Sequence, residues 1–154
     1  MNNLTLPSKL VELIEHDLWP KKQLISGTLF SEHVMQQFFP NEDNVCFYVP
    51  PFRTIAEYIA CDGEKYWLQE PLLKIEQVDI EKTLILADFG LGSDTYLALD
   101  YRQSPEPSVI KLVPNQDWKT LAHDFAQFSR ELNLEQVFTR KVWYYYDVDI
   151  QDFS

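Results

Sequence analysis

The sequence is poor in the residues that build thiol, metal and membrane-spanning sites. Its only two cysteines, Cys46 and Cys61, are isolated, and neither belongs to a Cys-x-x-Cys pair. This excludes zinc ribbons and dithiol redox motifs. We expect two reduced, buried thiols, with a single disulfide between them as the alternative. No apolar run approaches the roughly 20 residues that a membrane-spanning helix needs.

The N-terminal segment MNNLTLPSKLVELIEHDLW does not have the pattern of a secretion signal. It lacks a basic start, and Glu12, Glu15 and Asp17 interrupt its apolar part. A signal peptide combines a positively charged start with an uninterrupted apolar stretch. We therefore expect a cytoplasmic protein that does not bind a membrane.

Basic residues are also scarce. The chain has 13 lysines and arginines against 24 aspartates and glutamates, which gives a net charge of −11. Direct binding of nucleic acid is not expected, because it uses basic patches. The charge suits a basic protein partner, although an acidic surface can also serve solubility alone.

What the chain does contain is enough apolar material for one folded domain. Of its 154 residues 45% are hydrophobic and 14% aromatic, too many for a disordered chain. A capping-box pattern at Thr54 and Glu57 predicts a helix there, with a strand over 55–59 as the alternative. The other expected elements are helices over 8–19 and 31–39, strands over 44–49, 66–69, 84–89, 94–102 and 109–112, and a helix starting at Asn115 or Asp117 and running to Leu132.

The segment ILADFGLGSDTYLALDYR, residues 85–102, predicts a buried strand, a glycine turn at 90–93 and a second strand. The second strand alternates between a core face and a half-polar face. The core face holds Thr95, Leu97, Leu99 and Tyr101, and the half-polar face holds Asp94, Tyr96, Ala98, Asp100 and Arg102. No helix interrupts residues 84–112, so parallel βαβ units are hard to build. We predict an α+β fold, with a central, mostly antiparallel sheet packed by N-terminal and C-terminal helices.

The tripeptide Asp88-Phe89-Gly90 also occurs in protein kinases, where it binds magnesium. The kinase interpretation fails, because the glycine-rich loop, strand lysine and catalytic loop are missing and the chain is too short for two lobes. Asp88 and Asp94 could approach each other across the turn and hold Mg²⁺ or Ca²⁺. Alternatively, Asp94 hydrogen-bonds turn amides, and Asp100 forms an ion pair with Arg102.

No other group of side chains forms a recognisable reactive site. His16, His33 and His123 have no metal-binding spacing and are expected at the surface or at helix ends. No serine or cysteine lies in a nucleophile motif. We therefore expect no catalytic residues, no bound metal and no cofactor.

Several ordered motifs resemble the SUKH superfamily, in its Knr/Smi-like branch. They are YVPPFRTIAEYIA at 48–60, EKTLILADFG at 81–90, and ADFGLGSDTYLALDYR followed by PSVI and a Trp-led segment ending at LAHDFAQFSREL. The resemblance covers roughly residues 6–133, and we expect the SUKH-like domain to span residues 1–133. It implies that the family pattern is carried around the hairpin by Asp88, Gly90, Gly92, Ser93, Asp94, Asp100, Tyr101 and Arg102.

The resemblance implies an α+β fold and a function in binding rather than catalysis. Bacterial single-domain members of the family are mostly immunity proteins that neutralise a toxin, often a nuclease, by direct contact. We therefore expect a cognate toxin as partner, with a housekeeping scaffold as the alternative and a metal-dependent hydrolase as a third class.

Residues 134–154 lie beyond the resemblance and form an aromatic, acidic extension that we expect to pack on the same domain. Its segment VWYYYDVDI has strand-like composition. Packed as an edge strand, it could also form a homodimer interface. Tyr and Trp dominate binding hot spots, so the extension is a candidate partner-binding surface. The candidate residues are Tyr144, Tyr145, Tyr146, Asp147, Asp149 and Asp152.

Overall fold

The computed structural model describes residues 2–21, 24–26, 30–62, 74–90, 95–113 and 117–139. The predicted strand over 66–69 and most of the glycine turn lie outside them. The described elements are α1 (Ser8–Glu15), β1 (Leu24–Ser26), α2 (Glu32–Phe38), β2 (Val45–Phe47), α3 (Ile55–Asp62), η2 (Ile75–Gln77), β3 (Thr83–Asp88), β4 (Tyr96–Asp100), β5 (Ser108–Leu112), β6 (Trp118–Ala122), α5 (Phe125–Leu132) and α6 (Leu134–Thr139).

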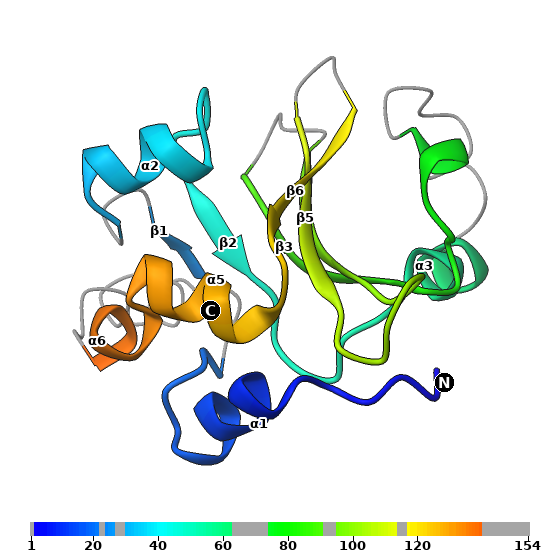
Figure 1. Cartoon of the computed structure of the whole chain (residues 1–154), viewed down its shortest axis with the longest axis horizontal. Helices are drawn as coiled ribbons and strands as arrows, with labels where there is room; N and C mark the ends of the chain where they lie inside the picture. The colour runs from blue at the N-terminus through cyan, green and yellow to red at the C-terminus, as the bar shows by residue number, and fades with distance from the viewer. Residues whose placement is uncertain are drawn as a thin grey trace.

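The strands form one antiparallel sheet in sequence order, β1 to β6, each beside the next. Figure 1 shows β3 and β5 nearly edge-on, with α5 and α6 on one side and α3 on the other. The predicted α+β class is therefore confirmed. Within the described residues, no helix is long and apolar enough to cross a membrane.

The sheet has an apolar core on each face. Leu97 and Leu99 point into a large core that also receives α1, α5 and α6, whereas Tyr96 and Ala98 point into a smaller second core. The predicted half-polar face of this strand is therefore wrong. All five residues of β4 are buried, because α3 and the η2 segment cover that face with residues such as Ile55.

The predicted start of the last long helix is also wrong. Residues 118–122 pair with β5 as strand β6, and α5 begins only at Phe125. Asp124 caps this helix by accepting a hydrogen bond from the Gln127 amide at 2.8 Å. The apolar residues before it matched a helical spacing, but the open edge of β5 supplied stronger pairing for their backbone than a helix could.

The first part of the C-terminal extension is helical. Leu134, Val137 and Phe138 of α6 are buried in the large core, and Asn133, with φ of 57°, makes the sharp connection from α5. Residues 140–154, with the candidate tyrosines and aspartates of the tail, lie outside the described residues.

The cysteines are both free, so the disulfide alternative is wrong. Cys46 is buried as expected. Cys61 is exposed, because it lies at the end of α3, away from the two cores.

The capping box at α3 is confirmed, and the strand alternative for this segment is wrong. The Thr54 amide donates to Glu57 Oε1 at 2.9 Å, and the Glu57 amide donates to Thr54 Oγ1 at 3.1 Å. Thr54 is only 2% exposed, so water cannot easily replace these bonds. The two bonds fix the start of α3 against β3, where Thr54 also bridges to Leu84.

We expect Thr54→Ala to lower the free energy of unfolding by about 1–2 kcal/mol, the usual loss for an N-cap. Urea denaturation monitored by circular dichroism measures it. Thr54→Ser keeps the hydroxyl and is the matched control, expected to recover more than half of the loss. Equal losses in the two variants would mean that the methyl group, and not the cap, stabilises this site.

Candidate functional site

The hairpin residues that carry the family resemblance do not form one site. Asp88 pairs with Tyr96 at one end of the β3–β4 ladder, and Asp100 pairs with Thr83 at the other. The length of the ladder separates their carboxylates. Gly92, Ser93 and Asp94 lie outside the described residues, so the turn between the two ends is described only at its borders.

The Asp100 end is a structural brace. Arg102 donates to both oxygens of Asp100, with the Nη2–Oδ2 pair at 2.9 Å, which confirms the predicted ion pair. This partner raises the pKa of Arg102. Arg102 also donates to the Gln77 carbonyl at 2.6 Å, and Tyr101 donates its hydroxyl to the Thr5 carbonyl at 2.9 Å. These contacts fix η2 and the N-terminal segment to the sheet.

Gln77 extends this brace to β6, the last strand of the sheet. Its Oε1 accepts from the Trp118 amide at 3.0 Å, and its Nε2 donates to Asp117 at 2.7 Å. The Trp118 amide therefore has its acceptor in η2, not in a further strand. A side chain that satisfies an edge amide in this way limits strand addition at that point.

The Asp88 end is different, because its carboxylate bonds only to neutral groups among the described residues. Oδ2 accepts from the Tyr48 hydroxyl at 2.8 Å, and Oδ1 accepts from the Gly90 amide at 3.0 Å. Gly90 has φ of 95°, which confirms that the turn begins with a glycine conformation. Burial, together with the charge of Asp88, raises the pKa of Tyr48, so its hydroxyl stays protonated as a donor.

The metal hypothesis gains no support from the described chain. Its proposed second ligand, Asp94, lies outside it, and the described residues contain no group of three or more His, Cys, Asp or Glu placed to hold an ion. The three histidines, His16, His33 and His123, are all exposed, as the sequence predicted.

Around Asp88 and β6 lies the surface that we call the aromatic face. Of the aromatic residues whose side chains are described, only Tyr48, Tyr58 and Trp118 are half-buried, and all the others are buried. All three pack against the second core. The ring centroids of Tyr48 and Tyr58 lie 6.4 Å apart, and the Arg53 guanidinium lies 5.9 Å from the Tyr58 centroid.

The aromatic face continues along η2 with half-buried aliphatic residues. Among the described residues, the second core has six buried members and seven partly buried ones, whereas the large core has 24 buried and eight partly buried. Within that part of the chain, the second side of the sheet is therefore the less completely covered one. Its partly buried aliphatic residues are Ile59, Ile75, Val78 and Ile80.

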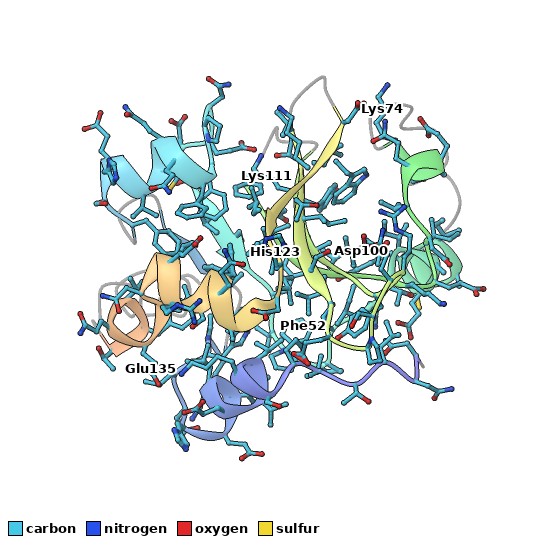
Figure 2. The ribbon with its side chains drawn as sticks, viewed as in Figure 1. Phe52, Lys74, Asp100, Lys111, His123 and Glu135 are labelled. Atoms are coloured by element: carbon cyan, nitrogen blue, oxygen red, sulfur yellow. The ribbon has the colours of Figure 1, made fainter. Side chains whose placement is uncertain are left out.

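A buried ion pair lies on the other side of the sheet. Lys111 Nζ lies 2.8 Å from Glu42 Oε2, and the two side chains are only 2% and 6% exposed. The same oxygen accepts from Thr95 Oγ1 at 2.6 Å, and the ammonium lies 4.5 Å from the Phe89 ring centroid. Figure 2 shows Lys111 and Asp100 on opposite sides of the sheet. Burial lowers the pKa of Lys111, and Glu42 opposes this effect.

The sequence missed both the aromatic face and the buried pair. It located the aromatic contact surface in the tail and gave Lys111 no role, because neither feature has a local signal. The continuous apolar run of β3 and the position of Tyr96 on the alternate face of its strand were the clues that a second apolar face existed. No family model, curated protein or solved structure matches the chain.

Proposed function

We propose that the chain is a non-enzymatic, cytoplasmic protein-binding domain, an immunity protein that neutralises a cognate toxin by direct binding. The observation that carries the proposal is that every half-buried described aromatic side chain packs against the second core, although Tyr48 also contacts the large one. Tyr and Trp anchors surrounded by other contacts are typical of binding hot spots. The resemblance to SUKH immunity proteins and the net charge of −11 support the same function.

The proposed mechanism is stoichiometric capture. The negative charge attracts a basic toxin surface, such as the active-site cleft of a nuclease, and raises the rate of encounter. The aromatic face then forms the short-range contact, since its rings are rigid and already ordered by the second core. Capture blocks the toxin because the bound domain covers the surface that its substrate needs.

The test begins by identifying the gene immediately upstream; where that gene encodes a large secreted protein, its C-terminal domain is the probe. We expect its association rate with this chain to fall at least about tenfold between 50 and 500 mM salt, because exposed charges are screened. The dissociation rate should change far less, since apolar contacts determine it. Surface plasmon resonance measures both rates.

Growth of cells that express the toxin domain, with and without this chain, tests neutralisation. Salt-independent association would contradict the electrostatic part of the proposal. Binding without any protection of growth would favour a scaffold over an immunity protein.

A further inference from the structure

Asp88 is the one well-enclosed carboxylate of the hairpin without a basic partner in the described chain. Asp100 pairs with Arg102 at 2.9 Å, and the buried Glu42 pairs with Lys111 at 2.8 Å. Asp88 is half-buried, yet its partners are the Tyr48 hydroxyl and the Gly90 amide. A carboxylate has about four lone-pair sites, so these two donors leave it room for a cation.

The carboxylate belongs to the aromatic face. Asp88 lies opposite Tyr96 in the β3–β4 ladder, and opposite residues of an antiparallel pair share a face. Tyr96 points into the second core, so Asp88 projects on the same side of the sheet. Its hydrogen bond to Tyr48 then brings it beside the Tyr48–Tyr58 ring pair.

One of the two rings, that of Tyr58, already accepts a guanidinium. Arg53 of this chain lies over Tyr58 at 5.9 Å, within the range of a cation–π contact. Arg53 forms no ion pair with Asp88 among the described residues. The face therefore combines an aromatic wall with a carboxylate that its own arginine does not neutralise.

We propose that Asp88, together with the rings of Tyr48 and Tyr58, receives an arginine or lysine side chain of the protein partner. The proposal rests on the binding function proposed above and specifies the chemistry of one contact. The Tyr48 hydroxyl and the Gly90 amide hold the carboxylate in place, so little freedom is lost when the cation arrives. A cation placed there meets a charge-assisted acceptor and the face of a tyrosine ring at once.

The first experiment uses arginine amide as the probe, titrated against the full chain and monitored by amide NMR shifts. The Gly90 amide is the reporter, since it donates to Asp88. We expect a saturable shift of Gly90 in the millimolar range, lost in Asp88→Asn. Tyr58→Leu, at a half-buried position, is a second variant that should reduce the shift if Asp88→Asn does not fold.

Asp17→Asn is the matched control. It removes the same charge from an exposed position at the end of α1, where φ of 59° suits asparagine. It should leave the Gly90 shift unchanged. A Gly90 shift that persists in Asp88→Asn, or that disappears equally in Asp17→Asn, would overturn the proposal.

The second experiment repeats the toxin-domain binding with the same variants. We expect Asp88→Asn to weaken toxin binding at least tenfold and Asp17→Asn to weaken it less than about twofold. Charges at the centre of an interface usually contribute more to affinity than charges at its periphery. Tight toxin binding that Asp88→Asn does not weaken would reject this contact while leaving the immunity function standing. A specific arginine response without any toxin binding would support the contact and reject the immunity function.

Discussion

Replacing Lys111 by alanine is expected to lower the free energy of unfolding by about 3–5 kcal/mol. The Glu42 carboxylate, 6% exposed, would lose its one ion-pair partner among the described residues and keep the hydroxyl donor Thr95. Leaving a buried charge without its partner destabilises the fold by far more than a surface ion pair stabilises it. Urea denaturation at pH 7 measures the difference.

The matched control removes both charges. Glu42→Gln combined with Lys111→Met preserves approximate shape and leaves no uncompensated charge, so its stability should lie within about 1–2 kcal/mol of the wild type. Removing the exposed Asp17–Lys21 pair, more than 70% exposed on both sides, should change stability by less than about 1 kcal/mol. A loss below about 1 kcal/mol in Lys111→Ala would mean that Glu42 reaches water or becomes protonated.

The pH dependence of stability provides a second test of the Glu42–Lys111 pair, because the direction of the change can be predicted. Burial lowers the pKa of Lys111 from its ordinary value of 10.5. Between the folded-state pKa and 10.5, the unfolded chain binds more protons, so stability should rise with pH across that window. The double variant, which has no lysine at this position, should lack this part of the rise.

The fold was predictable wherever the signals were local. Thr54 with Glu57 caps α3, as their spacing indicated, and α2 lies within the helix expected over 31–39. Strand β3 is buried from Thr83 to Ala87, as its continuous apolar run indicated. Each of these features depends on residues at most a few positions apart.

The errors arose where contacts between segments far apart in the sequence determine the structure. Residues 118–122 suit a helix by spacing, but pairing with β5 made them a strand. The second core needed α3 and η2 to pack on β4, which its alternating pattern alone did not reveal. Asp100–Arg102 was predictable because the two residues are only two positions apart, whereas Asp88–Tyr48 joins residues 40 positions apart.

The same contrast explains why the candidate site was only half predicted. The hairpin residues were identified, but their separation into two ends of a ladder and the ring pair beside Asp88 follow from tertiary packing. Composition indicated an acidic binding protein with aromatic anchors. It could not indicate which aromatics remain half-exposed, because burial depends on what packs over each ring.

Trp19 links the large core to the aromatic face. Its side chain is 3% exposed, and its ring centroid lies 5.2 Å from that of Phe47 and 5.5 Å from that of Phe138. Its indole Nε1 donates to the Tyr48 carbonyl at 2.8 Å. One side chain therefore packs β2 against α6 and also fixes the backbone of a residue in the aromatic face.

We expect Trp19→Ala to lower the free energy of unfolding by about 3–5 kcal/mol, through the cavity that it leaves among aromatic rings. Trp19→Phe refills much of that space and loses only the indole donor, so about 1–3 kcal/mol is expected. Urea denaturation of both variants separates packing from the hydrogen bond. An equal loss in the two would assign the effect to the Tyr48 carbonyl. In that case the NMR signal of the Gly90 amide should also shift in Trp19→Phe, because this amide lies next to the carboxylate that Tyr48 holds. Such a shift would mean that the large core positions the aromatic face through the hydrogen bond from Trp19 to Tyr48.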